Sequence, residues 1–302
     1  MKTAFIFPAF VSEYLGTEDQ ILRSFSGNFQ QKLDTLTRIT GDDYQNLSLD
    51  DPDFTHDELR SQIISYVFSC SLSDELTNRG LKPVAVAGYS MGLYAALYGS
   101  RVFEFEHGLQ LVEEAYAVSR SVIKGIDCGM GSVIGLTRDE IETLIIDFKI
   151  SAEIANTNSK YSHLITGKLK DVEHLLDKAR ETGAMNVSFL PVKTPYHSRL
   201  LKETQVEFGQ FIKNHIPLKE PDYPVISCID QKVLKTSEAI ANELVRNLHE
   251  SLNWKKTFEK LLNMGISQFV ECGAGKSLQK IGRFMDGEFI IYPMNKLHRI
   301  VD

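Results

Sequence analysis

Apolar residues along the chain form two kinds of pattern, short continuous runs and longer segments with an apolar residue every three to four positions. Short, mainly apolar runs at residues 3–10, where Pro8 stops the strand, and 82–88 predict buried strands. Between them, over residues 17–40 and 56–80, apolar residues recur every three to four positions, which is typical of amphipathic helices. Strands that alternate with helices indicate an α/β architecture, here a large domain with a mostly parallel sheet.

The pattern changes within residues 128–193, where the elements become shorter. Strands are predicted at 131–136, 151–157, 162–167 and 186–192, with helices at 137–148 and 170–184. This βαββαβ order is that of a ferredoxin-like unit. We therefore expect a small subdomain over residues 128–193, inserted into a large domain made of residues 1–127 and 194–302.

The α/β pattern resumes after the small subdomain. Helices are predicted at 198–215, 237–249, 254–265 and 276–284, and strands at 223–229 and 268–273.

The composition narrows the class of protein. The chain has 302 residues, is 43% apolar and carries a formal net charge of -7, which argues against nucleic acid or an anionic membrane as the main partner. The four cysteines show no metal-like spacing and indicate reduced, buried thiols. No segment has the ~20 apolar residues needed to span a bilayer. We expect a cytoplasmic protein.

The segment Gly88-Tyr89-Ser90-Met91-Gly92 lies between a predicted strand and a predicted helix. A Gly-x-Ser-x-Gly sequence in that context is typical of a nucleophile elbow, a tight turn that exposes a reactive serine at the carboxyl edge of a sheet. The N–H of Met91 would start the helix, where backbone dipoles stabilise an oxyanion. The alternative is a glycine-rich turn in which Ser90 only caps the helix.

A nucleophilic serine needs a base, usually a histidine. Of the eight histidines, His197 is the best candidate, since it follows the last strand of the small subdomain, in a proline-marked loop between the two domains. On local sequence alone it could instead be a solvated residue at a helix start. His249 and His298 are the competitors, and His215 suits a helix C-terminus.

Six segments in register resemble the malonyl-CoA:acyl carrier protein transacylase family, which includes the acyltransferase domains of polyketide synthases and related trans-acting acyl hydrolases. The resemblance covers nearly the whole chain. The matching segments are FIFPAF at the N-terminus, GYSMG, NTNSKYSHLITG, TPYHS, NLHESLNW and FVECGAGKSL.

The resemblance implies a ping-pong acyl transfer. Ser90 would attack an acyl-CoA thioester with His197 as general base, and the phosphopantetheine thiol of an acyl carrier protein would then take the acyl group. The backbone N–H groups of Phe10 and Met91 would form the oxyanion hole, and a carbonyl at Asn247 would orient His197. The substrate pocket would include Tyr89, Ala115, Asn158 and Tyr196, and less so Asn156.

One position departs from the family in a way that bears on the substrate. Aligned on the segment "LVE", Ala115 stands where malonyl-using members have an arginine for the substrate carboxylate. A buried carboxylate without a cationic partner is strongly disfavoured, and Arg120 lies on another side of the helix. An uncharged acyl group is therefore expected in place of malonate, in fatty-acid or polyketide biosynthesis.

Three alternatives stay open at this point. The first is a hydrolase that releases acyl chains from carrier proteins on the same scaffold. The second is an ordinary α/β-hydrolase esterase, which would use His298 as its base. The third is a catalytically silent docking subunit. No dinucleotide, phosphate-loop or metal-binding pattern is present, so no cofactor is expected beyond the thioester substrates.

Overall fold

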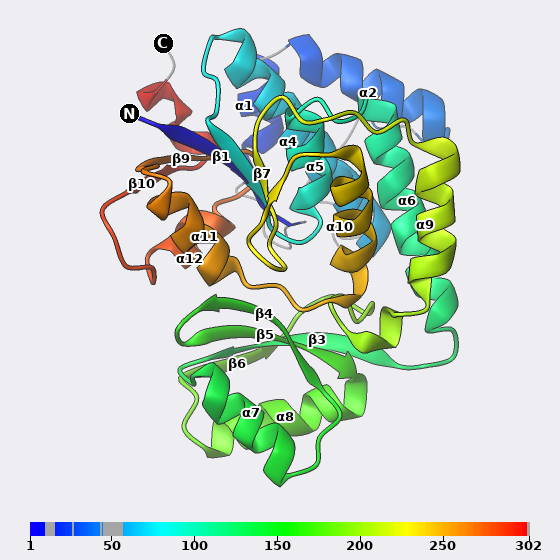
Figure 1. Cartoon of the computed structure of the whole chain (residues 1–302), viewed down its shortest axis with the longest axis vertical. Helices are drawn as coiled ribbons and strands as arrows, with labels where there is room; N and C mark the ends of the chain where they lie inside the picture. The colour runs from blue at the N-terminus through cyan, green and yellow to red at the C-terminus, as the bar shows by residue number, and fades with distance from the viewer. Residues whose placement is uncertain (10–15, 26, 43, 45–56, 301–302) are drawn as a thin grey trace.

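The computed structural model describes residues 1–9, 16–25, 27–42, 44 and 57–300. These form a large α/β body and a smaller one below it in the view of Figure 1. The α/β class and the mostly parallel main sheet predicted from the sequence are confirmed.

The main sheet has six strands in the order β10-β9-β1-β2-β7-β8. All neighbours are parallel except β7 and β8, which are antiparallel. The strands are β1 (Thr3–Phe7), β2 (Ala85–Gly88), β7 (Val225–Ile226), β8 (Val233–Leu234), β9 (Gln268–Glu271) and β10 (Ile290–Tyr292). The short β8 and β10 were not foreseen, and β7 is much shorter than the strand expected at 223–229.

Helices cover both faces of this sheet. Phe5 and Phe7 of β1 pack into the larger apolar cluster, while Ala4 and Ile6 point to the opposite one, as the alternation of a strand requires. The helices that contribute to the larger cluster are α1 (Glu18–Phe25), α2 (Gly27–Thr40), α4 (Glu58–Asn78), α5 (Gly92–Gly99), α6 (Phe105–Val122), α9 (Thr204–His215) and α10 (Ser237–His249). Those on the other face are α11 (Trp254–Asn263) and α12 (Ser277–Gly282). The 3₁₀ turns η1 (Arg199–Leu201) and η2 (Met294–Arg299) complete the large body.

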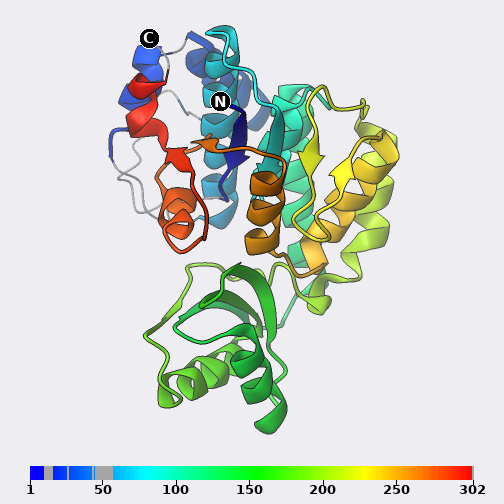
Figure 2. The same ribbon diagram turned by 60° about the vertical axis from the view of Figure 1, so that its left-hand side comes forward.

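The smaller body has the predicted βαββαβ order. Its strands are β3 (Cys128–Ile134), β4 (Glu153–Ser159), β5 (Ser162–Lys168) and β6 (Asn186–Phe189), and its helices are α7 (Arg138–Asp147) and α8 (Leu169–Glu181). The sheet order β4-β5-β3-β6 is antiparallel throughout. Both helices pack on the sheet face away from the large body (Figures 1 and 2).

Backbone hydrogen bonds join the two bodies. The Leu252 N–H donates to the Ala155 carbonyl at 2.8 Å, and the Thr157 N–H donates to the Leu252 carbonyl at 3.3 Å. The segment that leads into α11 thereby lies beside β4, with a single parallel bridge between Asn156 and Leu252. The carboxyl ends of β1, β2 and β9 face this junction, which is where parallel α/β sheets bind their ligands.

The four cysteines are buried and unpaired. Within the described ranges, no helix has the length and apolar character needed to cross a membrane.

Candidate active site

The turn that carries Ser90 is a nucleophile elbow in its geometry. Strand β2 ends at Gly88 and α5 begins at Gly92. Ser90 between them has a φ of 55°, a backbone conformation that residues other than glycine rarely adopt. A Cβ at Gly88 would collide with the backbone of Leu93, and one at Gly92 with the Phe7 carbonyl. The two glycines are therefore required by close packing of strand and helix around a strained serine.

The structure brings together Ser90 and His197, which precede and follow the small subdomain in the sequence. Ser90 Oγ lies 2.7 Å from His197 Nε2. The main chain of His197 has a φ of 60°, and its N–H donates to the Leu248 carbonyl at 2.8 Å, which holds the residue in place. In this arrangement the Ser90 hydroxyl can donate its proton to an unprotonated Nε2.

Burial keeps this imidazole neutral. His197 is 3% exposed, and desolvation lowers its pKa to about 4. The nearby carbonyls of Asn247 and Glu250 oppose this shift, but Nδ1 makes no full hydrogen bond to any described residue. At pH 7 the Nε2 lone pair is thus available to accept a proton.

The other predicted site residues lie close to this pair where they are described. Met91 directly follows Ser90 and caps the N-terminus of α5, while Phe10 lies outside the described residues. The Asn247 side chain donates to the Ser90 carbonyl at 3.3 Å, a contact that also steadies the elbow. The orienting role predicted for the Asn247 carbonyl stays a prediction.

A large, mainly apolar cavity of about 260 Å³ opens on one side of the Ser90–His197 pair. Tyr89 and Asn158 meet there, and the Tyr89 hydroxyl donates to Asn158 Oδ1 at 2.7 Å. The cavity lies between the two bodies. Its lining residues are Ala9, Tyr89, Ser90, Met130, Asn156, Asn158, Leu164, Leu190, Pro191, Val192, Tyr196, His197, Ser277, Leu278 and Ile281.

A second, small cavity of about 20 Å³ lies against the same pair within the large body. Ala115 of α6 lines it, whereas Arg120 is exposed and lines a separate surface groove. The cavity is lined by Gln62, Ser90, Met91, Tyr94, Ala115, Tyr196, His197, Asn247 and Leu248. No lysine or arginine is among the described residues that line either cavity.

Sequence reasoning missed three residues of the small cavity, the polar Gln62 and Tyr94 and the apolar Leu248. Gln62 donates through Nε2 to the Tyr196 hydroxyl at 2.9 Å. It lies in α4, most of whose residues are buried, so a glutamine within an otherwise buried helix was the available signal.

Helix α12 forms part of the wall of the large cavity, and a buried carboxylate fixes it in place. Glu271, at the end of β9, is 0% exposed and accepts from the N–H groups of Leu278 at 2.8 Å and Gln279 at 2.9 Å. A carboxylate at the first turn of a helix satisfies N–H groups that would otherwise lack partners. Glu271 is therefore a structural support of the site.

The competing histidines lie elsewhere. His298 is exposed on η2, and neither it nor His249 lines one of the two cavities. Over the described residues, no group of histidine, cysteine, aspartate and glutamate side chains could hold a metal ion.

Comparison with known proteins extends the resemblance over most of the chain. A scan against protein-family models gives no match. The chain is 27% identical over 278 residues to the malonyl CoA-acyl carrier protein transacylase of Synechocystis, covering 92% of each protein. It is 28% identical over 254 residues to the polyketide biosynthesis malonyl CoA-acyl carrier protein transacylase PksC of Bacillus subtilis, covering 83% of this chain and 86% of that protein.

Solved structures give the same result for the fold. The malonyl CoA-acyl carrier protein transacylase of Coxiella burnetii superposes with a TM-score of 0.90 at 26% identity, over 99% of this chain and 95% of that one. A malonyl-transacylase solved in complex with a type II polyketide synthase acyl-carrier protein also gives a TM-score of 0.90, at 23% identity, over 97% and 96% of the two chains. The resemblance inferred from six short segments is confirmed.

Proposed function

Sequence and fold relate this chain to the malonyl-CoA:acyl carrier protein transacylases, and from that premise we propose that it is a serine acyltransferase that loads an acyl carrier protein. The observation that carries the proposal is the 2.7 Å contact between Ser90 Oγ and His197 Nε2 at a strained elbow. The names of the relatives place this reaction in fatty-acid or polyketide biosynthesis.

In the first half-reaction, Ser90 Oγ attacks the carbonyl carbon of an acyl thioester, and its proton passes to His197 Nε2. The N–H of Met91, at the start of α5, stabilises the tetrahedral oxyanion together with the N–H of Phe10. When the C–S bond breaks, the thiolate of CoA leaves and takes up the proton from His197. The product is an ester between the acyl group and Ser90.

In the second half-reaction, the phosphopantetheine thiol of the carrier protein gives its proton to His197 and attacks the ester carbonyl. The C–Oγ bond breaks, and Ser90 regains a proton. The large cavity suits these steps, because it is a mainly apolar opening between the two bodies that reaches Ser90 and His197. All chemistry is supplied by the protein and the thioesters, so no cofactor is proposed.

The preferred acyl group is uncharged. Ala115, where an arginine would pair with a malonyl carboxylate, contributes only a methyl group to the small cavity. The remaining lining is neutral, since His197 is unprotonated at pH 7 and the lining has no lysine or arginine. A carboxylate buried here would lack the charged partner it needs.

Mass spectrometry of the Ser90 peptide tests the proposal. The protein is incubated with acetyl-CoA, butyryl-CoA or malonyl-CoA, and then with a phosphopantetheinylated carrier protein. We expect acetyl or butyryl groups on Ser90 that move to the carrier protein, and weak malonylation. Efficient malonylation would contradict the substrate assignment, and the absence of any acyl-Ser90 would contradict the function itself.

Hydrolysis of acyl-carrier protein is the second candidate. It is favoured by the absence of a lysine or arginine from the described lining of both cavities, because a hydrolase that releases uncharged acyl chains has no malonyl carboxylate to bind. The two activities share the acyl-Ser90 ester and differ in whether a thiol or water removes the acyl group.

A further inference from the structure

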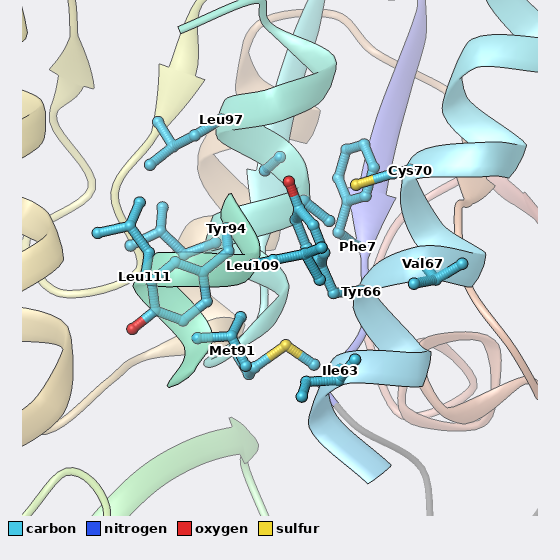
Figure 3. Close-up of a cluster of buried hydrophobic side chains, with 14 of the residues drawn as sticks. Phe7, Ile63, Tyr66, Val67, Cys70, Met91, Tyr94, Leu97, Leu109 and Leu111 are labelled. Carbon is cyan, nitrogen blue, oxygen red and sulfur yellow. The ribbon is translucent and has the colours of Figure 1, made fainter. Parts of the chain in front are cut away.

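The two members of the Ser90–His197 pair are held in place by different kinds of contact. Ser90 is fixed by close packing, and Met91, which follows it, is buried in the larger apolar cluster, part of which Figure 3 shows. His197 instead lies in the loop after the small subdomain, with a φ of 60°. A residue other than glycine keeps such a conformation only where the surrounding contacts impose it. The contacts of this loop therefore decide where the imidazole lies.

Glu153, at the first position of β4 in the small body, binds the residues that follow His197. Its Oε1 accepts from the Ser198 hydroxyl at 2.9 Å and from the Arg199 N–H at 3.3 Å. Its Oε2 accepts from Arg199 Nε at 3.0 Å. Ser198 is 0% exposed, so its hydroxyl depends on a partner within the protein. Hydrogen bonds to a carboxylate are stronger than those between neutral groups, which makes Glu153 a firm partner for this loop.

The main chain around His197 is thus held from two sides. Before the imidazole, the His197 N–H donates to the Leu248 carbonyl of α10 in the large body. After it, the Ser198 hydroxyl donates to Glu153, while Ser198 Oγ accepts from the Leu200 N–H at 3.2 Å and caps η1. One support comes from each body, and the second crosses from the small body to the large one.

Strand β4 also contacts the serine side of the pair. Asn158, near the other end of the strand, accepts from the hydroxyl of Tyr89, the residue before Ser90. Strand β4 therefore binds a sequence neighbour of each reacting residue. Glu153 lines neither cavity, so its contacts serve the loop of His197 and not the substrate.

We propose that Glu153 is a positioning residue for the general base, which it holds through Ser198 and Arg199 with Nε2 within reach of Ser90 Oγ. This inference rests on the proposed function, because it takes His197 as the base. No bond to the substrate forms or breaks at Glu153. The small subdomain, beyond forming a wall of the large cavity, supplies part of the support on which catalysis depends.

The test follows the acylation of Ser90 by two reagents. p-Nitrophenyl acetate, which requires no recognition of CoA, gives the rate constant and the amplitude of a burst of p-nitrophenolate. Butyryl-CoA, sampled by rapid quench and intact-protein mass spectrometry over a range of concentrations, gives the maximal rate and the half-saturating concentration.

In Glu153→Ala we expect the burst rate constant and the maximal rate to fall about 10²-fold, as for a catalytic group displaced by about 1 Å. The half-saturating concentration of butyryl-CoA should be unchanged, because Glu153 lines neither cavity. The burst amplitude, which counts the molecules with a working site, should be unchanged as well.

Two further variants keep the proposal falsifiable if Glu153→Ala fails to fold. Glu153→Gln keeps an oxygen for the Ser198 hydroxyl but presents an amide nitrogen to Arg199 Nε, and should lower the rate only about tenfold, the effect of one lost hydrogen bond. Ser198→Ala removes the partner on the other side and should also slow acylation. The double variant of Glu153→Ala and Ser198→Ala should be no slower than the slower single variant, because the two residues act as one unit.

Glu181→Ala is the matched control. The Glu181 carboxylate pairs with Lys178 at 2.7 Å on the surface of α8, in the same body as Glu153. Removing it deletes an acidic partner of the small subdomain without touching the loop of His197. Its burst rate constant and amplitude should equal those of the unaltered protein.

Unchanged burst rate constants in Glu153→Ala and Ser198→Ala would overturn the proposal. A loss of burst amplitude at an unchanged rate constant would do the same, because Glu153 would then support only the fold. Failure of the proposed function gives a different result, since the unaltered protein would form no acyl-Ser90 with either reagent.

Discussion

The Ser90–His197 pair separates two cavities of opposite character. The large cavity lies between the two bodies, is mainly apolar and has about 260 Å³, whereas the small cavity is enclosed by helices of the large body, carries buried polar groups and has about 20 Å³. The large cavity has room for a flexible arm, and the small one is lined by Ala115, the position at which the resemblance places the substrate's acyl group. The Ser90–His197 pair is thus shared by two spaces that differ in size and in lining.

The largest expected effect comes from the base that both cavities share. His197→Ala should lower the rate of Ser90 acylation by about 10³-fold, within the range for loss of a general base. The rate is measured from the burst with p-nitrophenyl acetate. The matched variant His298→Ala should acylate normally, because His298 is exposed and lines neither cavity. Loss of activity only in His298→Ala would show that the base is misassigned.

The elbow that places Ser90 between the cavities should tolerate no extra atom. Gly92→Ala would drive a Cβ into the Phe7 carbonyl and should lower the free energy of unfolding by about 3 kcal/mol, as overpacking of a close contact does. Urea unfolding measures the loss. Gly27→Ala is the control, since nothing lies within 4 Å of its Cβ position and it begins α2, where alanine is favourable. Equal stability of the two variants would contradict the packing argument.

The protonation of His197 should appear as an unusually low acid limb. Because burial lowers the pKa of His197 to about 4, the second-order rate of Ser90 acylation should stay level from pH 7 to about 5 and fall around pH 4. An unperturbed histidine would titrate near 6.5. The same shift stabilises the fold above pH 6.5, and this contribution is lost as the pH falls from 6.5 toward 4. An acid limb near 6.5 would mean that the imidazole is hydrated.

The smallest effect is expected in the wall of the large cavity. Tyr89→Phe removes the hydrogen bond to Asn158 and should alter acylation by CoA thioesters severalfold, through a net free energy of about 1 kcal/mol. A double-mutant cycle with Asn158→Ala isolates the pair. Unchanged acylation by CoA thioesters in Tyr89→Phe would show that this hydrogen bond does not shape the wall of the large cavity.

The sequence predicted the parts of this site that depend on local chemistry. Ser90 was identified from the glycines beside it, and His197 from its loop between two predicted domains, because elbows and junctions leave patterns over a few residues. The ferredoxin-like order was likewise visible in the strand and helix periods. These features are encoded by neighbours in the chain.

The positions of Gln62 and Tyr94 at a cavity could not be predicted in this way, because they arise from packing between α4, α5 and α6. A glutamine or tyrosine inside an apolar helix has the same local pattern whether it contacts another side chain or a cavity. The strands β8 and β10, with two and three residues, are likewise too short to produce a period. Tertiary contacts, rather than propensity, define them.

The backbone pairing of Leu252 with β4 has a mechanical consequence. A hinge rotation that opened the cleft widely would break the hydrogen bonds that Leu252 makes with Ala155 and Thr157. Their main-chain N–H and carbonyl groups would then lack partners. The arrangement thus favours a gap of nearly constant width, whose two sides are set before any substrate arrives. Acyl chains would then be selected by the fixed dimensions of a preformed cleft, and not by closure of the two bodies around the substrate.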